Sequence, residues 1–258
     1  MKKNTIIKFF LSLVVVFSFL SSYAQENESE KETNSEWNYT IAPYLLFPNM
    51  NGDVAIGPIG VDVSANPGDI FDNLDFGAML YAEMSNKDWA LTFDFLYMNL
   101  GKSGETPIGQ RAAEADIRQL AITLTGLRRV NNWFEAGVAG RLNIIDQSVM
   151  VDAGEVLPGS NASMQETWFD PLIVARAKTD FNGSKWKGAM LGDIGGFGIG
   201  SDLAWQVKPS IGYQFSELFS IDLAYRWLSM KYETGAGENY FLYDMVISGA
   251  EIGFIFDF

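Results

Sequence analysis

The sequence predicts an all-β fold: a transmembrane, antiparallel, up-and-down β-barrel of ten strands. Long segments alternate apolar and polar residues with a period of two, as in a strand with two different faces. Hydrophobic residues make up 48% and aromatic residues 14% of the 258 residues. After residue 24, however, no apolar run approaches the roughly 20 residues of a membrane helix. A closed barrel is the other way to satisfy every backbone group inside a membrane.

The first 24 residues have the features of a secretory signal peptide. Lys2 and Lys3 give a basic start, residues 6–20 are mainly apolar, and residues 22–24 (SYA) supply the small residues that a signal peptidase reads. We expect cleavage after Ala24. The alternative, an uncleaved N-terminal anchor, needs a longer uninterrupted apolar run.

Residues 25–36 (QENESEKETNSE) contain no apolar residue and are expected to be a disordered acidic periplasmic leader before the barrel domain, residues 37–258. The chain has no cysteine, which excludes a lipoprotein anchor and disulfides. Its net charge is −14, and removal of residues 1–24 takes away lysines but no acidic residue. This acidic balance argues against a nucleic-acid partner.

Short and long breaks alternate between the strands. The expected strands are 37–47, 76–85, 89–101, 115–130, 133–147, 168–181, 186–198, 202–215, 219–233 and 243–258. The short breaks, such as Asn131-Asn132, have tight-turn chemistry and are the expected periplasmic turns. The longer breaks, 48–75, 102–114, 148–167 and 234–242, then face outside.

Two details of the outer connections leave alternatives open. In the first outer break, residues 54–63 can extend the wall as a hairpin, and residues 69–74 can form one helical turn. The connection at residues 199–201 is very short. If it is a kink rather than a turn, the barrel has eight strands instead of ten.

Parity separates the two faces of each strand. In 219–233, for example, Leu223 and Tyr225 face one way while Asp222 and Arg226 face the other. The charged residues predicted to face the lumen are Glu83, Asp94, Glu135, Asp170, Asp180, Asp193, Asp222, Glu251, Asp257, Arg129, Arg141, Arg176, Lys178, Lys187, Lys208 and Arg226. The two signs are nearly balanced, which favours a lumen filled by salt bridges, whereas an ion-selective pore would show a bias.

The tight turns also predict partners across neighbouring strands. The turn at 131–132 sets Arg129 opposite Glu135, and the turn at 182–185 sets Asp180 opposite Lys187. The turn at 216–218 brings Lys208 opposite Arg226, a repulsion that requires nearby acids. Asp222 and Glu251 are the candidates.

Aromatic residues gather at the strand ends beside the short turns. They are Trp37, Trp89, Trp133, Phe181, Trp186, Phe215, Phe219 and Phe258. Such rings are typical of the girdle at a membrane interface. A stacking platform for a sugar or base would need them on one concave face.

The C-terminal strand carries an aromatic pattern on one face, formed by Ile252, Phe254, Phe256 and Phe258. This pattern resembles the sorting signal by which outer-membrane β-barrels are recognised and folded in Gram-negative bacteria. The resemblance implies contact with the assembly machinery.

The string DIGGFGIGSDLAWQ (193–206) superficially resembles a phosphate-binding loop, but no Lys-Ser/Thr follows it. Glycines that let two strands bend, approach and reverse are the better explanation. With residues 37–53, 74–77 and 224–227, the string resembles a family of uncharacterised small outer-membrane β-barrel proteins. That resemblance implies the fold and the outer-membrane location, and brings no catalytic residues.

The sequence therefore favours a non-enzymatic, monomeric outer-membrane barrel with a largely plugged lumen and no cofactor or metal. It would act in envelope structure or through binding by its outer loops, among outer-membrane lipids and lipopolysaccharide. Because the chain has no histidine, serine–histidine and aspartate–histidine mechanisms are excluded. Two alternatives stay open: a narrow porin-like channel for small solutes, and a histidine-free lipid or glycan hydrolase that uses paired carboxylates.

Overall fold

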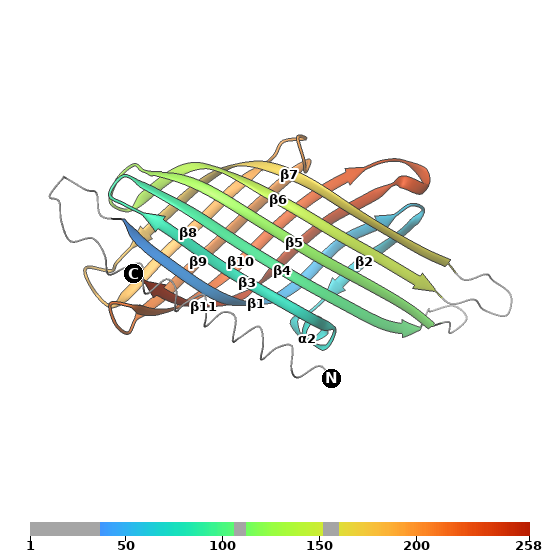
Figure 1. The fold of residues 1–258 in the computed structure, drawn as a ribbon, viewed down its shortest axis with the longest axis horizontal. Coiled ribbons are helices and arrows are strands. Elements are labelled where there is room, and N and C mark those ends of the chain that lie inside the picture. The colour runs from blue at the N-terminus through green and yellow to red at the C-terminus, as the bar shows by residue number, and fades with distance from the viewer. Residues whose placement is uncertain (1–36, 106–111, 152–159) are drawn as a thin grey trace, which may run out of the picture. The chain divides into compact units, whose positions relative to one another are not determined.

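The computed structural model describes residues 37–105, 112–151 and 160–258, and these form a closed antiparallel barrel (Figure 1). The predicted signal peptide and leader lie outside the described residues. The strands are β1 (Asn38–Ile56), β2 (Ile59–Ala65), β3 (Leu74–Ser85), β4 (Trp89–Glu105), β5 (Ala112–Arg129), β6 (Phe134–Val151), β7 (Ser160–Thr179), β8 (Trp186–Gly196), β9 (Leu203–Gln214), β10 (Phe219–Thr234) and β11 (Phe241–Asp257). Within the described residues, no helix is long and apolar enough to span a membrane.

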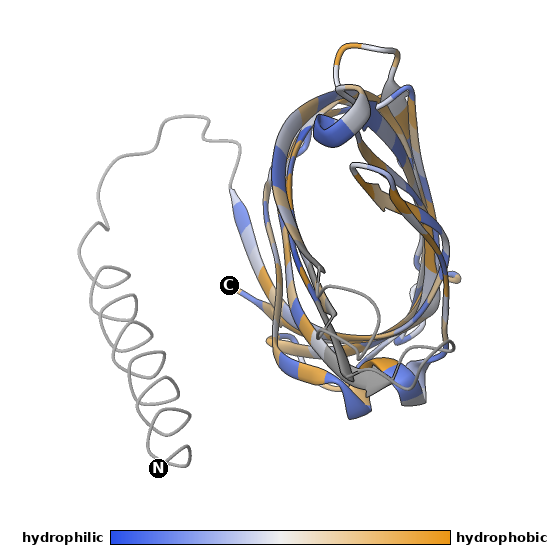
Figure 2. Cartoon of the chain, turned by 90° about the vertical axis from the view of Figure 1, so that its right-hand side faces the viewer, coloured by the Kyte–Doolittle hydropathy of each residue, from blue (hydrophilic) through white to orange (hydrophobic). Residues whose placement is uncertain are grey.

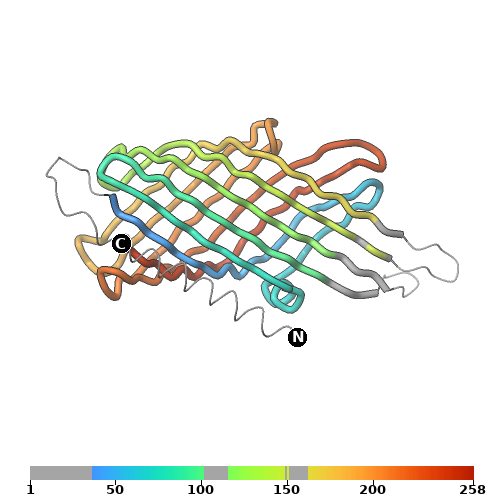
Figure 3. Tube along the Cα trace, viewed as in Figure 1, coloured from blue at the N-terminus to red at the C-terminus, as the bar shows by residue number. Residues whose placement is uncertain are grey.

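Ten of these strands make the ring. Each pairs with its neighbour in chain order from β3 to β11, and β1 closes the ring by pairing with both β3 and β11. The remaining strand, β2, pairs with the second half of β1. Figure 2 looks into this ring, and Figure 3 shows that the strands run obliquely, as closure of a barrel requires. The prediction of ten strands is confirmed.

The glycine-rich string between β8 and β9 is a turn, as predicted, and not a kink. Gly196 and Gly198 have φ values of +84° and +72°, a region that side chains with a Cβ rarely adopt. A Cβ on Gly195 would lie 1.9 Å from the carbonyl oxygen of Pro171 in β7. The glycines therefore permit both the reversal and the close approach of neighbouring strands.

We call the end of the barrel that holds Trp37 and Phe258 the terminal end, and the opposite end the loop end. The connections at the terminal end are the predicted tight turns. Asparagine side chains fold two of them: the Asn86 Oδ1 accepts from the backbone N–H of Trp89 at 2.8 Å, and the Asn131 Oδ1 accepts from that of Phe134 at 2.9 Å. Such Asx turns fix the register of the strands that they join.

The outward faces form a continuous apolar belt around the barrel. Each of the ten ring strands contributes at least one exposed large apolar residue: Leu45, Phe76, Leu91, Leu124, Val138, Ile173, Met190, Ile211, Leu223 and Phe254. Their exposed fractions run from 37% for Phe254 to 66% for Val138. On β1, the outward residues are apolar from Tyr39 to Phe47 and polar from Asn49. This span matches the roughly 9–11 residues of a tilted transmembrane strand.

Several strands extend beyond the predicted bounds at the loop end. There the outward face becomes polar, as in the Lys231–Asp244 pair at 3.6 Å and the Arg118–Asp146 pair at 3.4 Å. The inward face becomes apolar instead, and Met230 is fully buried. The predicted loop-end bounds were wrong at β1, β4, β5, β6 and β7 because the pattern beyond the belt is that of a water-exposed sheet with an apolar interior.

The predicted features of the first outer break are both present. Residues 54–63 lie in the hairpin of β1 and β2, and a short helix, α2 (Pro67–Asp72), follows. The Asn66 side chain caps α2 by accepting from the backbone N–H of Asp69 at 3.1 Å, and the Asp69 side chain accepts from the backbone N–H of Asn66 at 3.0 Å. This capping box explains why so short a helix begins at Pro67.

The aromatic residues of the terminal end form a chain of ring contacts across four strands. Ring centroids are 5.0 Å apart for Trp186 and Tyr213, 4.9 Å for Tyr213 and Phe215, 5.9 Å for Phe215 and Phe219, and 5.4 Å for Phe219 and Phe256. The rings follow the perimeter of the barrel, which is the arrangement of a girdle and differs from a concave stacking platform.

The two faces of β10 should respond differently to substitution. Leu223 is 53% exposed on the belt, whereas Ala224 faces the lumen between Ser210 and Glu251. We expect Leu223→Arg to cost roughly 2–4 kcal/mol of folding free energy near the bilayer midplane, and Ala224→Ser to cost much less. Urea unfolding in lipid vesicles measures both, and equal losses would mean that β10 is inverted.

Candidate functional site in the lumen

The lumen of the terminal half is lined by buried charged side chains. Glu135, Arg141, Arg176, Arg226 and Glu251 are each at most 6% exposed. An isolated buried charge is costly, so each of these groups needs partners inside the barrel. The partners fall into two clusters and one separate pair.

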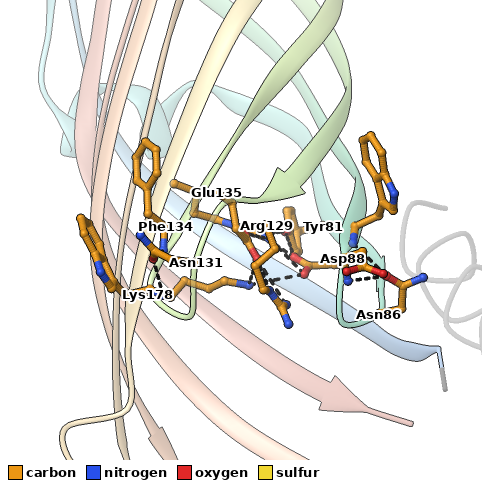
Figure 4. A network of polar contacts seen from close by, with 12 residues as sticks. Tyr81, Asn86, Asp88, Arg129, Asn131, Phe134, Glu135 and Lys178 are labelled. Atoms are coloured by element: carbon orange, nitrogen blue, oxygen red, sulfur yellow. Dashed lines mark hydrogen bonds and ion pairs between the residues drawn. The ribbon is translucent and has the colours of Figure 1, made fainter. Parts of the chain in front are cut away.

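The Arg176 cluster joins side chains from β3, β5, β6 and β7 (Figure 4). Its members are Tyr81, Glu83, Arg129, Glu135, Arg176 and Lys178. Arg176 pairs with Glu83 and, through Nη2, with the Glu135 Oε2 at 2.6 Å. Lys178 Nζ lies 3.0 Å from the Glu135 Oε1, and the Tyr81 hydroxyl donates to Glu83. Two carboxylates thus hold three bases together across four strands.

The Arg226 cluster joins side chains from β1, β4, β9, β10 and β11. Its members are Tyr44, Asp94, Lys208, Arg226 and Glu251. Arg226 donates to the Asp94 Oδ2 at 3.0 Å and places its Nε 2.9 Å from the Glu251 Oε2. Lys208 Nζ donates to the Glu251 Oε1 at 3.2 Å, and the Tyr44 hydroxyl donates to the Asp94 Oδ1 at 2.6 Å.

Cation–π contacts connect the two clusters. Lys208 Nζ lies 5.9 Å from the ring centroid of Tyr44 and 5.7 Å from that of Tyr81, and the two tyrosines belong to different clusters. The separate pair is Arg141 and Asp193, each predicted to face the lumen, and it is joined at 2.9 Å. Ion pairs and aromatic rings therefore form a layer across the lumen.

A cavity of about 780 Å³ lies on the terminal-end side of this layer. Tyr44, Tyr81, Arg176 and Lys208 from the layer line it, together with Asp180 and Lys187 at the terminal end. None of the buried apolar residues of the loop-end half, such as Met50, Met230 or Met245, lines the cavity. The cavity is therefore a vestibule that ends at the charged layer.

A second, apolar layer fills the lumen on the loop-end side. Its fully buried members include Met50, Leu96, Met98, Ile145, Met230, Phe241, Tyr243, Met245 and Ile247. The Trp168 ring stacks on Tyr232 with centroids 4.2 Å apart, and it lies 6.2 Å from that of Tyr243. Parity in the predicted strands did not show that such residues fill the lumen, and Met50 and Phe241 lie in the breaks 48–75 and 234–242 that were predicted to be outer loops.

The predicted cross-strand partners have different outcomes. The pair Arg129 and Glu135 is confirmed: the two residues are register partners, and their side chains are 3.3 Å apart. The pairing of the neighbouring residues in β9 and β10 places Lys208 opposite Arg226, as predicted. Glu251 forms an ion pair with each of these two bases, also as predicted. Asp94 from across the lumen is a further acid that the prediction missed. Asp222 makes no ion pair with either base among those of the described residues, but its carboxylate interacts electrostatically with Lys208 and through a hydrogen bond with Ser210.

The predicted Asp180–Lys187 ion pair is absent from the ion pairs of the described residues. The register itself is correct, because Thr179 pairs with Gly188. The ladder ends at that pair, and Phe181, Asn182 and Gly183 continue with positive φ values. The Asp180 and Lys187 side chains are consequently exposed at the mouth of the vestibule.

Double-mutant cycles should distinguish these two pairs. We expect Arg129→Met and Glu135→Gln to show measurable coupling, on the order of 1 kcal/mol, because Glu135 is buried. We expect Asp180→Asn and Lys187→Met to be additive, because both residues are exposed. Urea unfolding in vesicles checks both cycles, and stronger coupling at 180/187 would contradict the observed turn.

Asp170 has a role that the sequence analysis missed. It is fully buried in β7, and all its hydrogen-bond donors are neutral: the Asn143 Nδ2 at 2.9 Å, the Trp168 Nε1 at 3.1 Å, and the Ser201 backbone N–H at 2.6 Å and hydroxyl at 2.9 Å. The carboxylate therefore fastens the 197–202 turn to the wall. The signal that the sequence offered was an inward-facing acid, Asp170, in a chain that also carries the glycine-rich string at 193–206.

The chemistry available to the site is limited. Within the described residues, no group of three or more aspartates or glutamates could hold a metal ion. The carboxylates of the two clusters are all engaged by arginine, lysine or tyrosine. The arrangement is suited to neutralising charge and filling the lumen.

No protein-family model matches this chain, and no curated protein matches it by sequence. Solved structures resemble its fold. Ail of Yersinia pestis, solved with the heparin analogue sucrose octasulfate, has a TM-score of 0.36 at 12% identity over 86% of this chain and 98% of Ail. The Ralstonia pickettii toluene transporter TbuX has a TM-score of 0.35 at 6% identity over 87% and 89%. The Pseudomonas aeruginosa outer membrane protein OprG has a TM-score of 0.30 at 11% identity over 87% and 97%.

Proposed function

We propose that this chain is a non-enzymatic β-barrel of the Gram-negative outer membrane, exported by a signal peptide that is cleaved after Ala24. The apolar belt supports the membrane location, because it surrounds the barrel and has the height of a bilayer core. The terminal end would face the periplasm and the loop end the outside. Outer-membrane lipids and lipopolysaccharide would then contact a monomeric barrel.

The proposed role rests on one observation: two successive layers of side chains close the lumen. A charged layer and an apolar layer follow one another along the barrel, and the vestibule ends at the first of them. Solutes would have to displace buried ion pairs and then buried methionines and aromatics. A barrel of this kind serves envelope structure or carries binding loops on the outside, and it does not act as an open channel.

The hydrolase alternative receives little support from the geometry. Inward carboxylates without a basic neighbour do occur toward the loop end, where Asp170 and Glu166 both lie near Tyr232. Asp170 is fully buried, however, and its oxygens accept from Asn143, Trp168 and Ser201. A substrate cannot reach that carboxylate without unfolding the turn.

Conductance of the refolded, mature protein in planar bilayers tests the closed lumen. We expect no steady open level at low applied voltage, with insertion verified by protease protection of the strands in the same lipid. A steady conductance in 1 M salt would contradict the closed barrel and establish the alternative, a narrow channel for small solutes.

We also propose that Phe258 belongs to an assembly signal with Ile252, Phe254 and Phe256. The Phe258 backbone N–H donates to the Tyr39 carbonyl at 2.8 Å, and its carbonyl accepts from the Tyr39 N–H at 3.1 Å. Deletion would remove both bonds, so Phe258→Ser, which keeps the backbone, is the sharper test.

For Phe258→Ser we expect a loss of membrane-inserted protein in cells that exceeds any loss of stability in vesicles. Fractionation and urea unfolding, measured side by side, check this. Trp133→Ser is the matched control, because Trp133 is 60% exposed at the same end but outside the C-terminal strand. Equal assembly defects in both variants would show that the C-terminal pattern is only lipid-facing surface.

A further inference from the structure

The wall between β1 and β3 opens partway along the barrel. The two strands pair from Asn38 and Ser85 to Pro43 and Leu80, and there the pairing ends. On this side, β1 next gains a partner at Met50, which pairs with Ala65 of β2. Residues 44–49 therefore have no partner in the ladder with β3, whose residues 76–79 continue their ladder with β4. We call this interruption the wall window.

Helix α2 crosses the wall window from the end of β2 to the start of β3 (Figure 1). Its Ile70 is 5% exposed and packs in the apolar layer of the lumen. The next residue, Phe71, is 43% exposed, and its ring centroid lies 5.3 Å from that of Phe47 on β1. One side chain of the helix thus faces the lumen and its neighbour faces outward. Helix α2 therefore occupies the position that a wall strand would otherwise fill.

The wall window begins in the apolar belt and ends at its loop-end margin, where the outward residues of β1 become polar at Asn49. Leu45 on one margin is 54% exposed, and Phe76 on the other is 44% exposed. A backbone group without a partner costs several kcal/mol in hydrocarbon, so the wall of a membrane barrel rarely leaves such a gap. Pro48 has no backbone N–H, so residues 44–49 contain one donor fewer that would need a partner.

The lumen behind the wall window is apolar and adaptable. Leu46, Met50, Leu96 and Met98 are each at most 3% exposed, and Met79 packs against them. Methionine side chains are flexible and repack around ligands of different shape. Together these side chains offer an aliphatic chain an apolar surface.

We propose that the wall window is a lateral port through which an acyl chain of a surrounding membrane lipid enters the apolar layer, with α2 as its lid. The occupant follows from the position, because hydrocarbon is the phase that contacts Leu45, Phe71 and Phe76 at the level of the belt. A helix of six residues, with Ile70 as its one buried residue, is a segment that opens locally at low cost. The proposal rests on the proposed membrane location.

Photocrosslinking from a lipid tests the port. The mature protein is refolded in phosphatidylcholine vesicles that contain a phospholipid with a diazirine on one acyl chain, and labelled residues are mapped by mass spectrometry. Outward Leu45 and Ala78 report the membrane location. We expect inward Met79 and Met98 to be labelled as well, and Phe71→Ala to raise that inward labelling severalfold.

Phe169→Ala is the matched control. Phe169 is a 53% exposed ring on β7, whose ladder with β6 is continuous there, so this variant should leave inward labelling unchanged. A short bifunctional thiol crosslinker between Phe47→Cys and Phe71→Cys, in a chain without other cysteines, should suppress it. Inward labelling at background in wild type and Phe71→Ala, with Leu45 and Ala78 labelled, would overturn the port alone. Absence of outward labelling would overturn the membrane location.

Discussion

Replacing Arg176 with methionine is expected to destabilise the barrel by about 3–5 kcal/mol. The guanidinium pairs with both Glu83 and Glu135, whose side chains are 12% and 2% exposed. Without it, Glu135 keeps Lys178 at 3.0 Å and Arg129 at 3.3 Å, but the nearest base to Glu83 is Lys178 at 3.9 Å. The loss therefore comes mainly from a carboxylate left buried without an adequate partner.

Lys178→Met is the matched control for this prediction. Lys178 belongs to the same cluster and carries the same charge, but its side chain is 36% exposed. We expect it to cost about 1 kcal/mol or less, in line with exposed ion pairs. Urea unfolding of both variants in the same vesicles makes the comparison. If the two losses were equal, burial would not determine the energy of the cluster.

Arg226→Leu is expected to have an effect of similar size, about 3–5 kcal/mol. It removes a repulsion with Lys208 but deprives Asp94 of its ion-pair partner at 3.0 Å. Glu251 is affected less, because Lys208 remains 3.2 Å away. The net result is a loss, since the Asp94 carboxylate, whose side chain is 18% exposed, would keep the Tyr44 hydroxyl as a donor but no ion-pair partner among those of the described residues.

The double variant Arg226→Leu with Asp94→Leu tests this explanation. Replacing both partners of a buried pair with apolar residues is often nearly neutral, so we expect the double variant to recover most of the stability that Arg226→Leu loses. Arg226→Leu with Asp222→Leu is the control, because Asp222 makes no ion pair with Arg226 among those of the described residues. Equal recovery in the two double variants would contradict the observed network.

Sequence parity predicts what is local to a strand or a turn. Alternation distinguishes Leu223 from Ala224, and the short turn at 131–132 fixes Arg129 opposite Glu135. It cannot predict contacts across the lumen, because these depend on barrel diameter and on rotamers. Asp94 and Arg226 are 132 residues apart on strands that are not neighbours, and this explains why Asp94 was missed as a partner of Arg226.

The ends of the strands were less predictable than their number. Outside the belt, outward residues such as Lys231 and Asp244 are polar and inward ones such as Met245 are apolar. This reversal ends the membrane pattern without ending the strand. The sequence likewise predicts the hairpin at 54–63 and the helical turn at 69–74, but not the wall window between them and β3, because pairing between distant segments is not a local property.

A cysteine scan along β10 tests the central claim, a membrane barrel closed across its lumen, most directly. The chain has no cysteine, so each variant carries one thiol that can be probed in outer-membrane preparations. Ser220 lines the vestibule, Leu223 lies on the belt, and Leu228 is 2% exposed in the apolar layer. With a charged maleimide on both sides, we predict that Ser220→Cys reacts and Leu228→Cys does not, while Leu223→Cys reacts only with a lipid-soluble maleimide. Reaction of Leu228→Cys at the rate of Ser220→Cys would establish a water-filled lumen and contradict the closed barrel, and reaction of Leu223→Cys with the charged reagent would contradict its place in the membrane.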